Sequence, residues 1–127
     1  MFHFEINIEK AHDLIQKYLE DKNNQIHSRE SEVAMRAMAK ELGEDEETWG
    51  IAGLLHDLDW EQTAEDWPNH GLKTMENLKE EDCEIPEEVA HAISAHNGEH
   101  TGVSRESKLD YALAAGESIT GLIYAYA

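Results

Sequence analysis

Apolar residues recur every three or four positions through almost all of this 127-residue sequence, and that spacing restricts the chain to an all-α fold. The first run lines one face of a helix with Ile8, Ala11, Ile15, Tyr18 and Leu19. The alternation of apolar and polar residues that marks a half-buried strand is absent. The length suits one domain over 1–127. We therefore predict a compact bundle of five or six helices without strands.

Residues that start and stop helices set the expected boundaries. Asn7 and Ser107 are expected to cap the first and last helices, and Gly43 to end the second. We expect the second helix to begin near Ser28, after a break at 23–24. Its apolar residues fall on one side, at Val33, Ala37, Met38 and Leu42. The other helices are expected at about 45–58, 70–81, 86–96 and from 107 onwards, with a loop at 59–69.

Charge and targeting signals limit the partners. The chain holds 28 acidic and 10 basic residues, which give a formal net charge of −18. Phosphate neutralisation needs clustered Lys and Arg, so this charge excludes a nucleic-acid polymer bound through a basic face and argues against anionic membranes. No apolar run reaches the roughly 18 residues of a membrane span, and the first residues lack a secretory signal. We expect a cytoplasmic protein whose single cysteine, Cys83, stays reduced.

A histidine followed by an aspartate comes near the end of the apolar stripe of the expected third helix, which consists of Ile51, Leu54, Leu55 and Leu58. Ala52 and Gly53, just before this pair, are small enough to let another helix approach closely. Neighbouring side chains on a helix differ by about 100° in direction, so His56 and Asp57 can converge at the edge of the buried face. An imidazole beside a carboxylate supplies two ligands for Mn, Fe, Co, Ni or Zn. The alternative is a surface histidine next to an aspartate at a helix end.

Four further residues of metal-binding type lie at helix ends or on inner faces. Glu117 shares the inward face of the last helix with Leu113, where a carboxylate is costly unless it is paired or metal-bound. His96 lies on an apolar face of the fifth helix, where a hydrogen-bonded core histidine is the alternative to a ligand. His27 is expected just before the second helix, and His70 at the start of the fourth.

The order of these residues resembles the HD superfamily of metal-dependent phosphohydrolases. The resemblance covers roughly residues 26–124, and the run Ala52-Gly53-Leu54-Leu55-His56-Asp57 looks like the family's signature. His70-Gly71 and the run 92–97 are similar to its two intervening histidine motifs. The ligands that the resemblance implies for a first metal are His27, His56, Asp57 and Glu117. For a second metal they are His70 and His96, with Asp57 as the bridge.

Two departures from the family pattern concern the chemistry at this site. Glu117 stands where aspartate is usual, and the run Leu58-Asp59-Trp60 lacks the lysine that would face a substrate phosphate. We expect Asp57 to act in catalysis by orienting the nucleophilic water, and Asp59 to hold a histidine or accept a proton. Trp60 and Trp67 either anchor the loop or line the substrate mouth. Candidate phosphate partners, with ordinary surface charge as the alternative, are Arg29, Lys73 and Lys108.

The leading hypothesis is a metal-dependent phosphohydrolase that uses metal-activated water on a phosphomonoester or phosphodiester of a small metabolite or nucleotide. It would hold one or two divalent ions, with Mn, Fe, Co, Ni, Mg and Zn all open. A second hypothesis is an HD-type diiron oxygenase, which would consume oxygen. A third is a non-catalytic module that binds a metal or nucleotide. The apolar run 121–127 is expected to dock into the core or a homodimer interface, or to mark a chain shorter than its relatives.

Overall fold

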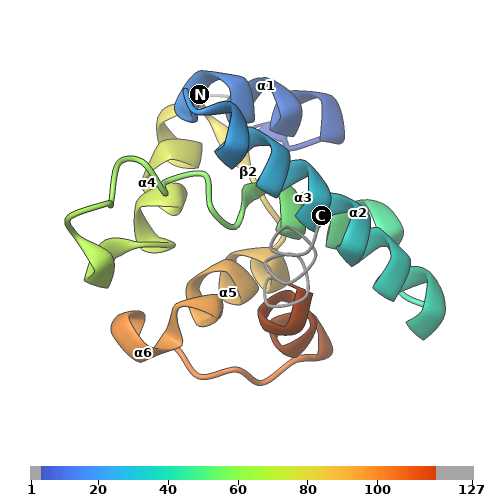
Figure 1. Ribbon diagram of the computed structural model, residues 1–127. Helices are drawn as coiled ribbons and strands as arrows, with labels where there is room; N and C mark the ends of the chain where they lie inside the picture. Colours follow the sequence, from blue (N-terminus) through green and yellow to red (C-terminus); the bar gives the residue numbers. More distant parts are fainter. Residues whose placement is uncertain (1–3, 117–127) are drawn as a thin grey trace.

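The computed structural model describes residues 4–116, which fold into a bundle of helices (Figure 1). Helices α1 to α5 span Ile8–Tyr18, Lys22–Leu42, Glu46–Leu55, Leu72–Glu80 and Glu87–His96. The 3-10 turn η1 covers Trp67–Asn69, the one-turn helix α6 covers Gly98–Thr101, and a last helix runs over 108–116. The all-α prediction is confirmed. Among these helices, none combines the length and apolarity that a bilayer crossing requires.

The predicted capping residues begin and end their helices as expected. Asn7 Oδ1 accepts a hydrogen bond from the backbone N–H of Lys10 at 2.8 Å, at the start of α1. Ser107 Oγ accepts one from the N–H of Asp110 at 3.0 Å, at the start of the last helix. Gly43 ends α2 with a φ of 72°, a left-handed conformation that favours glycine. These caps depend on neighbouring residues alone, so the sequence predicts them well.

The start of α2 is earlier than predicted. The sequence indicates a start near Ser28, but the helix begins at Lys22. The Asp21 carboxylate caps this start by accepting a hydrogen bond from a first-turn N–H at 2.8 Å. Glu61, from the loop after α3, accepts another from the N–H of Asp21 at 3.1 Å. This long-range contact adds a first turn, so His27 lies inside the helix and not before it.

The buried face of α2 also differs from the predicted one. Val33 and Leu42 are 67% and 52% exposed. The buried residues are instead Ser28, Ser31, Met35 and Ala39. The reason is the close approach of α3, where a Cβ added to Gly53 would lie 2.5 Å from the backbone oxygen of Ser31. Only small or slender side chains fit between the two helices, and the expected role of Gly53 in close packing is confirmed.

Helix α3 is the centre of the bundle and places its C-terminal end in the interior. It contacts α1, α2 and α5 (Figure 1). Every residue from Trp49 to Leu55 is buried, including the predicted stripe, which continues beyond the helix to Leu58. A buried helix of this kind gains hydrophobic stabilisation on all sides. Residues that directly follow α3 are therefore held inside the molecule.

A short strand pair joins the N-terminal segment to the chain before α5, although the sequence predicts no strand. Strand β1 at Phe4–Glu5 runs parallel to β2 at Cys83–Glu84, with Phe4 opposite Cys83. The N–H of Ile6 extends the ladder by donating to the carbonyl of Glu84 at 2.8 Å. Two residues are too few to show an alternating pattern, so this pairing leaves no signal in the sequence.

Candidate metal centre

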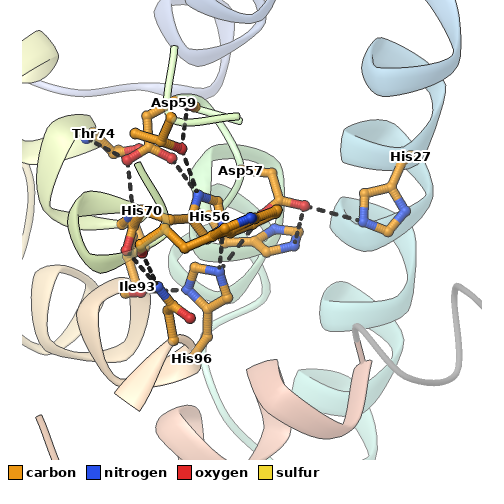
Figure 2. A network of polar contacts seen from close by, with 12 residues as sticks. His27, His56, Asp57, Asp59, His70, Thr74, Ile93 and His96 are labelled. Carbon is orange, nitrogen blue, oxygen red and sulfur yellow. Dashed lines mark hydrogen bonds and ion pairs between the residues drawn. The ribbon is translucent and has the colours of Figure 1, made fainter. Parts of the chain in front are cut away.

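The site is built around the carboxylate of Asp57, which follows the C-terminal cap of α3 (Figure 2). Its Oδ2 lies 3.2 Å from Nε2 of His56 and 3.3 Å from Nε2 of His27. Its Oδ1 lies 3.0 Å from Nε2 of His70 and 3.5 Å from Nε2 of His96. Each carboxylate oxygen therefore faces one pair of imidazole nitrogens.

Four separate elements supply the four histidines. His27 comes from the second turn of α2, and His56 is the C-terminal cap of α3. His70 is the C-terminal cap of η1, two residues before α4 begins, and His96 is the last residue of α5. His56, His70 and His96 are buried, whereas the His27 side chain is 27% exposed. The cluster is therefore most accessible on the side of α2.

The second ring nitrogen of each buried histidine is held by an acceptor. His56 Nδ1 donates to the carbonyl of Gly53 at 2.6 Å, and His96 Nδ1 donates to the carbonyl of Ile93. His70 Nδ1 lies 2.7 Å from Oδ1 of Asp59. Because these contacts occupy Nδ1, each ring directs Nε2 towards Asp57 (Figure 2).

Asp59 fixes His70 and the start of α4 together. Its side chain is fully buried, and Oδ2 accepts hydrogen bonds from the N–H of Gly71 at 2.6 Å and of Thr74 at 3.0 Å. The carboxylate thus caps a helix whose own N-cap residue, Gly71, has no side chain to do so. Asp59 lies on the far side of His70 from Asp57. This position favours the expected role of holding a histidine over that of accepting a proton, and both roles stay predictions.

The histidines keep Asp57 ionised. Burial raises the pKa of Asp57, but the neighbouring His56 and hydrogen bonds with His27, His56 and His70 outweigh it and hold this pKa well below its usual range. Burial lowers the pKa of His70, but hydrogen bonds with Asp57 and Asp59 outweigh it and raise this pKa to about 9. A negative charge is therefore maintained at the centre of the cluster.

The chemistry of these donors fits metal ions. Two groups share Asp57, with His27 and His56 in one and His70 and His96 in the other, and the ligand atoms within each group lie within 4.8 Å of one another. His70 Nε2 and His96 Nε2 are 3.1 Å apart. A proton on Nε2 of His70, which the raised pKa of this ring favours, can lie between the two nitrogens without a metal, and a shared cation would take its place. Imidazole and carboxylate are ligands for several first-row divalent ions.

The structure brings some predicted residues to this cluster and not others. Glu117, the predicted last ligand, lies outside the described residues. Lys73 pairs with Glu76 at 2.9 Å on the exposed side of α4. Arg29 is exposed, and helical geometry turns it about 200° from His27. Lys108 lies 3.8 Å from Glu44, just beyond the C-terminal end of α2. Along the helix axis this end is about 25 Å from His27, so Lys108 lies away from the cluster.

Several supporting residues escape sequence analysis. Thr63 Oγ1 lies 3.3 Å from His70 Nδ1 and donates to the carbonyl of Asp59 at 2.8 Å. Asn97 Nδ2 donates to the carbonyls of Trp67 at 2.9 Å and of His70 at 3.1 Å. These contacts join separate loops and have no local signal. The hydrogen bonds from His56 and His96 to backbone carbonyls do have a local signal in the sequence, because each spans only three residues in the last turn of a helix.

Comparison with known proteins bears on the same part of the chain. A family model described as HD domain matches residues 24–120. The match includes Asp57 and all four histidines around it. No curated protein and no solved structure matches the sequence.

Proposed function

The chain belongs to the HD-domain family, and we propose that it is a metal-dependent phosphohydrolase acting on a phosphomonoester or phosphodiester of a small metabolite or nucleotide. The observation that carries this proposal is Asp57, whose two oxygens face two separate pairs of histidines. When bound, a pair of divalent ions supplies Lewis acidity, which lowers the pKa of water and neutralises charge on phosphoryl oxygens.

Each part of the cluster has a proposed role in holding these ions. His27, His56 and Oδ2 of Asp57 would hold one ion, and Glu117 is the further ligand that we propose for it. His70, His96 and Oδ1 of Asp57 would hold the second. Asp57 is then the bridge between the two. A net charge of −18 repels anions, so the charge of bound metal is what would attract a phosphate to this protein.

The remaining residues orient the ligands and control access. Asp59 holds the His70 ring in the tautomer that leaves Nε2 free to bind a metal. The burial of His56, His70 and His96 keeps bulk water away from three of the four rings. Substrate would approach past the partly exposed His27, where α2 borders the cluster. The low dielectric of such a site strengthens the attraction between phosphoryl oxygens and the ions.

Elemental analysis and a phosphate-release screen test the proposal together. The purified protein would be analysed for metals and assayed on phosphomonoesters and phosphodiesters with added Mn, Co, Ni or Mg. His56→Ala and Asp57→Ala should each lose both bound metal and activity. His100→Ala, which removes an exposed histidine on α6, is the matched control and should keep both. Phosphate release by a metal-free Asp57→Ala protein would refute the proposal.

A diiron oxygenase is the second candidate, and one observation favours it. In the described chain, every ion pair of Asp57 is with a histidine, and no lysine or arginine pairs with it. Four histidines and a bridging carboxylate also suit a pair of iron ions. Iron-loaded protein prepared without oxygen would then consume oxygen when substrate is added. Absence of oxygen uptake across the same substrate panel would dispose of this candidate.

A further inference from the structure

Several of the exposed large apolar residues lie within three positions of a candidate metal-centre residue in the sequence. The large apolar residues that remain exposed among residues 4–116 are Ile26, Val33, Leu42, Trp60, Trp67, Leu72 and Tyr111. Ile26 directly precedes His27, and Trp60 directly follows Asp59. Trp67 and Leu72 lie on either side of His70. Apolar surface that collects around a polar site is typical of a surface that binds a ligand.

Trp60 and Trp67 lie closest to the cluster because both pack against His70. The ring centroids of the two tryptophans are 5.0 Å apart, and they lie 5.4 Å and 5.7 Å from the His70 ring, all edge to face. His70 in turn contacts Asp57 at 3.0 Å. Trp60 nevertheless stays 36% exposed and Trp67 40% exposed. The His70 ring therefore lies between the exposed indole rings and the carboxylate of Asp57.

Hydrogen bonds hold the backbone at Trp67 and the residue next to Trp60 in place without any ligand. Asn97 Nδ2 donates to the carbonyl of Trp67 at 2.9 Å, which ties η1 to the end of α5. Glu61, the neighbour of Trp60, accepts a hydrogen bond from Asn24 Nδ2 at 3.0 Å, which ties the other end of the loop to α2. A surface that is ordered before binding loses little conformational entropy when a ligand arrives.

The charges near these rings disfavour a second anionic group on the substrate. The nearby Lys73 is paired with Glu76, and the charged groups that contact His70 are the carboxylates of Asp57 and Asp59. Among the described residues, Arg105 donates to the carbonyl of His96 at 3.1 Å, so a second anionic group on a substrate would compete with contacts that these cations already make, whereas a flat ring could stack on exposed indole. We propose that Trp60 and Trp67 form an aromatic wall that contacts the organic part of the substrate and selects a flat ring without negative charge. This inference rests on the proposed phosphohydrolase function and adds its substrate class.

Two phosphonates test the wall without turnover, because hydrolysis of an ester does not cleave their carbon–phosphorus bond. Binding of phenylphosphonate and methylphosphonate to the metal-loaded protein would be measured by calorimetry. The phenyl probe should bind roughly ten-fold more tightly, in the lower part of the range for stacking on an aromatic side chain. Trp60→Leu and Trp67→Leu should each reduce this ratio, and Trp60→Phe should keep most of it. Tyr111→Leu, which removes an exposed aromatic residue from the last helix, is the matched control and should leave the ratio unchanged.

The outcomes separate the wall from the activity. Equal affinities in the wild type, no binding of either probe, or an unchanged ratio in both leucine variants would overturn the wall. Equal weakening of both probes together with loss of metal would also overturn it, because the tryptophans would then only support His70. If no phosphate is released from any ester while the phenyl preference still depends on the tryptophans, the wall stands and the proposed hydrolysis fails.

Discussion

Replacing Asp59 by asparagine separates the two tasks of this buried carboxylate. Oδ2 accepts the N–H groups of Gly71 and Thr74, and an asparagine oxygen can still accept both. Oδ1 lies 2.7 Å from Nδ1 of His70, where the asparagine amide can only donate. His70 Nδ1 must then accept, so the proton of the neutral ring moves to Nε2. That nitrogen faces Asp57, and it would no longer be available to a metal.

The expected magnitudes differ for metal binding and for stability. Loss of a carboxylate that orients a metal-bound histidine typically lowers metal affinity by about 10- to 100-fold, and both Asp59→Asn and Asp59→Ala should show this. Asp59→Ala also leaves two buried N–H groups unpaired, at about 1–3 kcal/mol each, so the free energy of unfolding should fall by about 2–6 kcal/mol. Asp59→Asn keeps both hydrogen bonds, now to an uncharged oxygen and at roughly half the strength of charge-assisted ones. Its free energy of unfolding should therefore fall by clearly less than that of Asp59→Ala.

Two measurements check this pattern. Metal content after equilibration with limiting Mn gives the affinity order, and urea unfolding in the presence of a chelator gives stability without metal. Asp66→Asn is the matched control, because it makes the same change at an exposed carboxylate of the same loop. The reasoning is refuted if Asp59→Asn binds metal as the wild type does, or if the alanine and asparagine variants are equally stable.

Three further predictions follow from other contacts. Gly53→Ala would place a Cβ 2.5 Å from the backbone oxygen of Ser31, so the free energy of unfolding in urea should fall by about 1–3 kcal/mol. An unchanged urea midpoint would contradict the close packing of α2 and α3. Burial raises the pKa of Asp110, but hydrogen bonds from the N–H groups of Glu106 and Ser107 and from His91 outweigh it, so the pKa is lower folded than unfolded. The free energy of unfolding should therefore be larger for the wild type than for Asp110→Asn above about pH 4, and this difference should shrink as the pH falls further. A difference in urea unfolding that stays constant down to about pH 2.5 would contradict this. A chelator should lower the melting temperature of metal-loaded wild type but not of Asp57→Ala, because metal stabilises only the folded state that binds it, and equal shifts would contradict the site.

The fold could be predicted where its signals are local. The stripes of α1 and α3 and the caps at Asn7, Gly43 and Ser107 depend on residues a few positions apart, and the structure confirms them. The start of α2 and its buried face could not be predicted in this way. The start depends on Glu61, and the buried face depends on contact with Gly53. Both are long-range contacts that outweigh local apolar spacing.

The site could be predicted as a set of residues but not as a geometry. The sequence indicates His27, His56, Asp57, His70 and His96, and the structure places them together. Their roles as ligands stay predictions, as do the cytoplasmic location, the small phosphorylated substrate and the homodimer. The helix that holds Asp59 in place and the loop contact of Asn97 depend on the folded chain. Charge alone suggests Lys108 as a phosphate partner, but its place depends on where the last helix packs, and that is against Glu44.

Helix ends explain why the cluster forms where it does. The last carbonyls of a helix lack intrahelical partners, and the helix dipole makes that end negative. His56 and His96 each satisfy one such carbonyl through Nδ1, in α3 and in α5, and the same hydrogen bond turns Nε2 towards Asp57. Two negative helix ends and an ionised carboxylate thus meet at one point, which favours a cation. The start of α4 brings a positive end to the same place, and Asp59 offsets it while it orients His70. Asp59 follows Asp57 by two residues, so a single turn of the chain provides both carboxylates. Asp57 lies at the centre of the cluster, and Asp59 neutralises the positive N-terminal end of α4.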